Sequence, residues 1–134
     1  MAAVPIRIDA GRLLGPAVRA MIDVSDGLVQ DLGHVCRASR VAAEVEAHAL
    51  PAAPACRRAL GAAAACFAAT AGEDYELLCT ASPRMRGRLA RLAPRLGCRL
   101  TRIGRIVAGR PVVRLLDARG RPVRLRRAGF DHFR

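Results

Sequence analysis

Two carboxylates and a hydroxyl fall within four positions, at Asp23, Ser25 and Asp26, where an apolar run over residues 18–24 gives way to a helical pattern over residues 28–39. The order predicts a strand, an acidic turn and a helix. Asp26 can cap the helix, and the neighbouring backbone N–H groups favour an anion. Carboxylates here also suit Mg²⁺, which takes oxygen ligands and is often shared with substrate phosphates. An ordinary cap in a strand-to-helix turn explains the same residues, so this pattern alone leaves both interpretations open.

The rest of the chain shows short segments with alternating and helical patterns. We expect a short edge strand over residues 5–9, a turn or short helix over 11–16, strands over 41–46, 75–80 and 98–107, helices over 55–69 and 82–97, and a hairpin over 112–125 that turns at 118–121. This mixture predicts an α+β fold with a mixed, largely antiparallel sheet covered by helices. We expect one domain over residues 11–134, preceded by an N-terminal extension or edge strand over residues 1–10.

Composition limits how the core can be built. With 134 residues the chain can bury a core without disulfides or structural metals. Hydrophobic residues make up 52% of the sequence but aromatic ones only 3%. The core must therefore consist of Ala, Val, Leu and Ile side chains, which lets helices and strands approach closely.

The formal charge of +12 is unevenly distributed along the chain. Residues 1–80 carry seven arginines and nine acids, whereas residues 81–134 carry sixteen arginines and two acids. Such a surface could attract a phosphate backbone, but aromatic residues that would stack on bases are almost absent. We do not expect nucleic acid as a partner. An RNA-binding domain stays an alternative, and its affinity would fall steeply with salt without needing Asp23 or Asp26.

The cysteine pattern indicates a reducing compartment, and the hydropathy indicates a protein that is neither secreted nor inserted in a membrane. The five cysteines show no C-x-x-C spacing, so we expect reduced thiols and neither a zinc site nor a disulfide framework. No apolar run reaches 18 residues, and the N-terminus does not have the pattern of a secretory signal. We expect a cytoplasmic protein that does not enter a membrane.

A second acidic turn, Gly-Glu-Asp-Tyr-Glu at residues 72–76, follows about fifty residues after the first, and Gly-Phe-Asp-His-Phe at 129–133 lies next to the last residue. Together with Leu50-Pro51, these motifs resemble the bacterial thiamine-monophosphate kinase family. That family belongs to a superfamily shared with aminoimidazole ribonucleotide synthetase and selenophosphate synthetase. The resemblance covers residues 11–133 but only the C-terminal half of a family member. It implies that an N-terminal ATP-binding domain is absent from this chain.

The resemblance also implies a role for individual residues. Asp23 and Asp26 would bind Mg²⁺, Ser25 would contact the ATP phosphates, Glu73 would contact thiamine monophosphate, and Phe130 would lie against that substrate. Phosphoryl transfer depends mainly on positioning and charge neutralisation, and the acceptor phosphate is largely ionised at neutral pH, so we expect no catalytic general base. A carboxylate and an aromatic ring also suit a cationic heterocycle. The implied partners are ATP, thiamine monophosphate, the N-terminal domain and a possible second copy.

Several expectations limit this interpretation. The isolated chain is expected to be inactive, and a ligand-binding or assembly module of the same fold is the alternative function. Where the family usually has a glycine, this chain has Ala71, which would be strained by a left-handed backbone. His34 is expected to be a surface or satisfied histidine and not a ligand, and His48, in a turn, has no partner spacing. Glu76 is expected to be a solvated charge at a strand edge.

Overall fold

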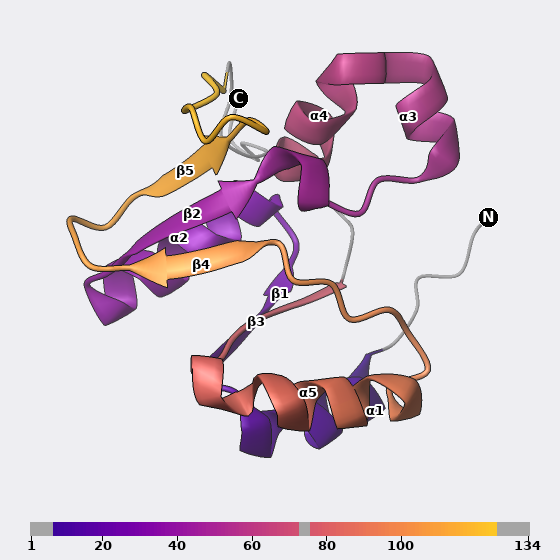
Figure 1. The fold of residues 1–134 in the computed structure, drawn as a ribbon, viewed down its shortest axis with the longest axis vertical. Helices are drawn as coiled ribbons and strands as arrows, with labels where there is room; N and C mark the ends of the chain where they lie inside the picture. The colour runs from indigo at the N-terminus through magenta and orange to yellow at the C-terminus, as the bar shows by residue number, and fades with distance from the viewer. Residues whose placement is uncertain (1–6, 73–75, 126–134) are drawn as a thin grey trace.

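The computed structural model describes residues 7–72 and 76–125, which form two small sheets with helices around them (Figure 1). One sheet is a ribbon of β1 (Ala20–Val24) and β3 (Glu76–Thr80). The other has three strands in the order β4-β2-β5. Helix α2 (Leu28–Ser39) contacts both sheets, so it joins them into one hydrophobic core.

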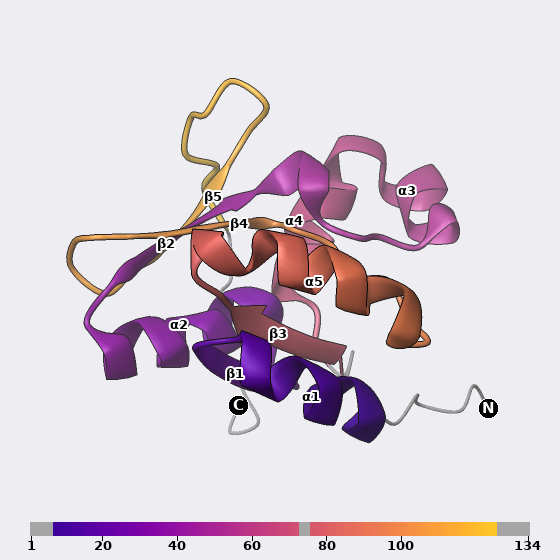
Figure 2. The same ribbon diagram turned by 60° about the horizontal axis from the view of Figure 1, so that its bottom comes forward.

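The ribbon is antiparallel and carries a helical layer on one face. In its register Asp23 lies opposite Leu77, and Val24 lies opposite Glu76. Helices α1 (Ile8–Leu14) and α5 (Arg86–Leu92) lie side by side against it, as Figure 2 shows. Ala10, Leu14 and Leu96 are buried between these helices and the ribbon. Leu89 of α5 packs against the same cluster.

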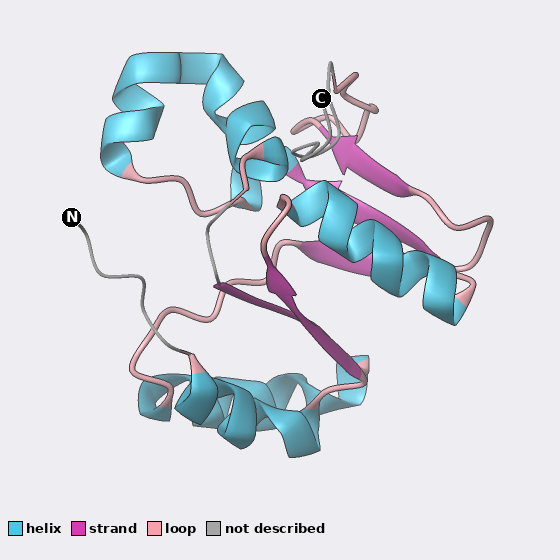
Figure 3. Ribbon diagram, turned by 180° about the vertical axis from the view of Figure 1, so that it is seen from behind, coloured by secondary structure: helices cyan, strands magenta, loops and turns pink. Residues whose placement is uncertain are grey.

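The three-stranded sheet is mixed. Strand β2 (Ala42–Glu46) pairs antiparallel with β4 (Gly104–Val107) and parallel with β5 (Val113–Leu116). From behind, α2 covers the face of this sheet (Figure 3). The side chains of Cys36, Val45 and Leu115 are less than 2% exposed there. The α+β class with antiparallel and mixed pairing is thus confirmed, over two separate sheets in the described residues.

Small side chains let the backbones come close, as the composition predicted. Ala42 and Ala43 of β2 are almost wholly buried. A β-carbon placed on Gly104 would overlap the carbonyl oxygen of Glu44, so only glycine fits at the start of β4. The Glu44 carboxylate in turn accepts a 2.8 Å hydrogen bond from Arg105 Nε across the same strand pair.

Four expected elements differ from those observed. Ile8 and Asp9 lie in α1 and not in an edge strand, while residues 1–6 fall outside the described residues. The helix expected over residues 55–69 is broken into α3 (Pro54–Leu60) and α4 (Ala64–Thr70), because Gly61 has a φ of 51°. The strand expected over residues 98–107 spans only Gly104–Val107, where β2 supplies its hydrogen-bond partners.

The C-terminal hairpin is also shorter than expected. After β5 only an isolated bridge joins Leu116 to Pro122, although the turn lies close to the expected place. The side chain of Asp117 closes this turn, because Oδ1 accepts the backbone N–H groups of Arg119 and Arg121 at 2.8 Å each. Within the described residues, no helix is long and apolar enough to cross a membrane.

Candidate functional site

The ribbon brings the two acidic turns together. Because β1 and β3 are antiparallel, the end of β1, where the first turn begins, lies beside the start of β3, just after the second turn. Two glycines make the contact close. A β-carbon on Gly27 would lie 2.8 Å from the carbonyl oxygen of Thr70, and one on Gly72 would lie 2.7 Å from that of Ser25. Thr70 and Gly72 therefore pack backbone against backbone on the first turn, although they lie almost fifty positions from it in the sequence.

Ala71 does not strain the second turn. Its φ is −67° and its ψ is 136°, an extended backbone that alanine adopts without penalty. Its N–H donates to the carbonyl oxygen of Phe67 at 2.7 Å and so ends α4. The expected strain at this position is wrong, because the close approach falls on Gly72.

The first turn is organised by a buried carboxylate from the helix that follows. Asp31 is 3% exposed, and its Oδ2 accepts the backbone N–H of Ser25 at 2.8 Å and that of Asp26 at 3.1 Å. These are the N–H groups that the sequence suggested for an external anion. The sequence shows how far Asp31 lies from the turn. It does not show that Asp31 is buried or that its carboxylate points back to the turn.

The predicted site residues of the first turn lie around these two hydrogen bonds, which we call the Asp31 clamp. Asp23 is exposed at the end of β1, and Ser25 and Asp26 are half-buried. Gly27, with a φ of 116°, takes the N-cap position of α2, so the expectation that Asp26 occupies the cap position is wrong. Gln30 Nε2 donates to Asp26 Oδ2 at 3.3 Å.

Two predicted site residues belong to segments that the structure does not describe. Glu73 and Phe130 lie outside the described residues, as does the closing motif at 129–133. In the part of the chain that is described, no three His, Cys, Asp or Glu side chains gather so that they could hold a metal ion. Of the predicted site residues, the structure therefore describes Asp23, Ser25 and Asp26.

Arg7 connects the segment before α1 with the start of β3. Its guanidinium donates to both carboxylate oxygens of Glu76, from Nε at 2.9 Å and from Nη2 at 2.8 Å. This hydrogen bonding lowers the pKa of Glu76 and raises that of Arg7. Glu76 is exposed as expected, yet it is paired at the edge where the acidic turns meet.

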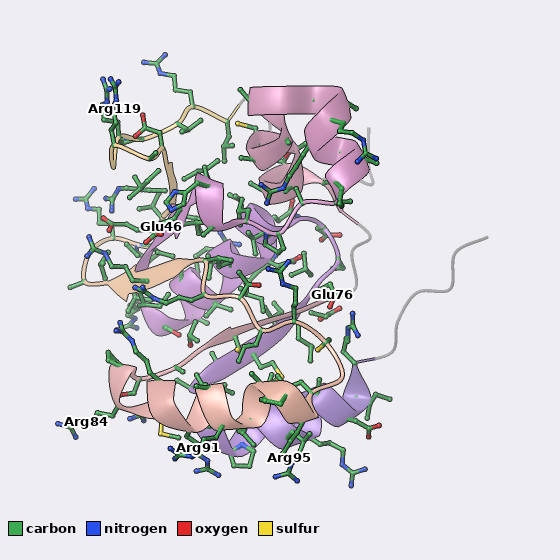
Figure 4. All side chains as sticks on the ribbon, turned by 45° about the vertical axis from the view of Figure 1, so that its right-hand side comes forward. Glu46, Glu76, Arg84, Arg91, Arg95 and Arg119 are labelled. Carbon is green, nitrogen blue, oxygen red and sulfur yellow. The ribbon has the colours of Figure 1, made fainter. Side chains whose placement is uncertain are left out.

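Three arginines around α5 and two histidines are exposed. In Figure 4, Arg84, Arg91 and Arg95 point outward from the helical segment around α5, and all three side chains are exposed. His34 and His48 are both exposed, and Nδ1 of His34 lies 2.9 Å from Nη2 of Arg37.

A groove of about 240 Å³ lies at the opposite end of the ribbon from the acidic turns. Ala20, at the start of β1, and Thr80, at the end of β3, line it together with Ile106 of β4. The acidic turns do not contribute to this groove.

The sequence of this chain is similar to those of known proteins. Residues 1–116 match the family described as "AIR synthase related protein, C-terminal domain". The thiamine-monophosphate kinase of Salmonella typhimurium is 40% identical over 128 residues, which are 95% of this chain and 39% of that protein. The kinase of Haemophilus influenzae is 38% identical and covers 96% of this chain and 40% of its own length.

Solved structures agree with these relatives. The crystal structure of thiamine-monophosphate kinase from Stenotrophomonas maltophilia K279a has a TM-score of 0.76 and 42% identity, covering 87% of this chain and 36% of that one. A structure described as AaThiL complexed with AMPPCP and TMP has a TM-score of 0.72 and 28% identity, covering 95% of this chain and 38% of that one. The chain thus spans about two fifths of the length of the relatives it matches. It belongs to the family described as the C-terminal domain of AIR synthase related proteins.

Proposed function

We propose that the chain is the C-terminal part of a thiamine-monophosphate kinase, which transfers a phosphoryl group from ATP to thiamine monophosphate and forms thiamine diphosphate. The observation that carries the proposal is the backbone contact between the two acidic turns through Gly27 and Gly72. Gly72, the first residue of the second motif, thereby lies against Ser25 of the first. Relatives with that name that are 38 to 40% identical support the same assignment.

In this proposal the first turn binds the metal and the nucleotide. Asp23 and Asp26 would hold Mg²⁺, and Ser25 would contact the ATP phosphates. Hard carboxylate oxygens suit Mg²⁺, which commonly takes one or two of them and completes its shell with phosphate oxygens and water. The bound ion would neutralise charge on the transferring phosphoryl group.

The second turn and the closing motif would bind thiamine monophosphate. We assign Glu73 and Phe130 to this substrate because a carboxylate and an aromatic ring attract a cationic ring. The acceptor phosphate has a second pKa of about 6, so it is already a nucleophile at neutral pH. The residues of this chain then need only to orient the two phosphates and exclude water, without a general base.

The complete site would need protein outside this chain. We propose a single domain over residues 11–134, joined in the complete protein to an N-terminal ATP-binding domain, with a possible homodimer and a cytoplasmic location. The 134-residue chain alone is then inactive, because the acidic turns form only one side of the site.

Thiamine diphosphate formation tests this proposal. The 134-residue chain is incubated with Mg²⁺-ATP and thiamine monophosphate, alone and with the separately produced N-terminal part of a thiamine-monophosphate kinase. We expect product only in the complemented mixture, and none with Asp26→Asn. Asp9→Asn, which alters an exposed carboxylate on α1, is the matched control and retains activity.

Other outcomes would redirect the assignment. Turnover by the chain alone would show a complete kinase. Binding of Mg²⁺-ATP without turnover in either mixture would instead favour the non-catalytic module of the same fold.

A further inference from the structure

Asp31 is the single charged or polar side chain that is buried among the described residues, at 3% exposure. It lies in the N-terminal helical turn of α2, and no described cation forms an ion pair with it. Its Oδ2 accepts hydrogen bonds from the backbone N–H groups of Ser25 and Asp26. A buried carboxylate costs folding energy unless it is hydrogen-bonded, so these two bonds stabilise both the burial of Asp31 and the backbone of the turn.

The same two N–H groups would otherwise be the natural donors to a phosphate. A turn that precedes a helix presents backbone N–H groups and a positive dipole, which together attract anions. Here Asp31 already occupies these donors with an anion of the chain itself. A second anion at this point would meet the repulsion of the carboxylate.

We propose that Asp31 is a positioning residue that makes phosphate binding at the first turn depend on a divalent cation. By holding Ser25 N and Asp26 N, it fixes the backbone from which the Ser25 hydroxyl and the Asp26 carboxylate project. Phosphate then approaches through a cation held by Asp23 and Asp26, and not through the N–H groups of the turn. This inference rests on the proposed function and adds the group that orders its metal ligands.

Pyrophosphate is a suitable probe, with Mg²⁺ added or removed by a chelator. In the wild-type 134-residue chain, calorimetry is expected to detect pyrophosphate binding only with Mg²⁺. Nuclear magnetic resonance follows the amides of Ser25 and Asp26 in the same titrations. Metal-free pyrophosphate that binds and shifts these two amides would overturn the inference.

Asp31→Asn tests the clamp itself. Removing the charge weakens the acceptor of two N–H groups, so the Ser25 and Asp26 amides should exchange faster with solvent. Positioning groups behind metal ligands affect metal affinity by about 10- to 100-fold, and we expect Mg²⁺ affinity to fall by that factor. Asp9→Asn should change neither quantity. Unchanged amide exchange and Mg²⁺ affinity in a folded Asp31→Asn chain would also overturn the inference.

The two proposals can fail separately. Mg²⁺-dependent pyrophosphate binding without any thiamine diphosphate formation in the complemented mixture would contradict the proposed kinase and leave the role of Asp31 supported. Kinase activity together with metal-free pyrophosphate binding at the Ser25 and Asp26 amides would do the reverse. If Asp31→Asn does not fold, the wild-type titrations with and without Mg²⁺ still decide.

Discussion

The backbone of Gly72 lies so close to that of Ser25 that a β-carbon on Gly72 would be 2.7 Å from the Ser25 carbonyl oxygen. Neither residue can move away without a large energetic cost. The contacting atom is a backbone atom, and Ser25 N is hydrogen-bonded to Asp31. This contact fixes the distance between the two acidic turns.

Gly72→Ala should therefore destabilise the protein. Overpacking of this kind costs about 1 to 3 kcal/mol, and we expect that loss in the free energy of unfolding measured with urea. Gly87→Ala is the control, since a β-carbon there would meet only the end of the Arg91 side chain at 3.6 Å in a helix. The control should be neutral or more stable by up to about 1 kcal/mol. Equal stability of the two variants would contradict the close contact.

The Arg7–Glu76 pair predicts a pH dependence of stability. Hydrogen bonding from Arg7 lowers the pKa of Glu76, so its folded state favours the carboxylate. The stabilisation is present above the pKa of the unfolded glutamate, about 4.3, and is lost as pH falls through the lower folded pKa. Arg7→Gln should therefore be less stable than the wild type at neutral pH, with a difference that narrows under acid.

Urea unfolding across this pH range measures the effect. Glu76→Gln should behave as Arg7→Gln does, and the double variant should lose little more than either single one, because one interaction is removed in all three. Both groups are partly exposed, so added salt should reduce the difference. A difference that stays constant down to strongly acidic pH would exclude the pair as its cause.

Leu115 predicts how much the core depends on β5. Its side chain is 1% exposed and packs in the cluster that includes Val45 and Cys36. Leu115→Ala should lower the free energy of unfolding by about 2 to 5 kcal/mol, whereas Leu115→Met should lower it by less than about 1.5 kcal/mol. Leu100→Ala, at a residue that is 37% exposed, is the control and should have a small effect. Similar losses for Leu115→Ala and Leu100→Ala would contradict the observed packing.

Cysteine labelling should follow burial. Cys36 is fully buried and Cys79 is half-buried, and burial raises the pKa of both thiols, so little thiolate is present at neutral pH. With iodoacetamide and mass spectrometry, we expect Cys36 to resist labelling until the protein unfolds. Cys56, which is partly exposed on α3, should label before Cys36. Labelling of Cys36 at the rate of Cys56 in the folded chain would contradict the core.

Part of the candidate site was predictable from local sequence. The strand, acidic turn and helix over residues 18–39 are confirmed, and α2 ends at Ser39 as expected. The carboxylates of this turn, Asp23 and Asp26, were also identified from the sequence, although their roles stay predictions. Periodicity indicates such elements because it reflects which residues a short segment buries on one face.

The sequence by itself determined the kinds of elements, the small-residue core and the two acidic turns. Only the tertiary structure decided that β1 pairs with β3, that β2 lies between β4 and β5, and that Gly27 and Gly72 bring the turns into contact. It also decided that Asp31 is buried against the first turn. Local patterns record neighbours a few positions apart, whereas strand pairing and burial depend on distant backbone groups that meet only in the folded chain.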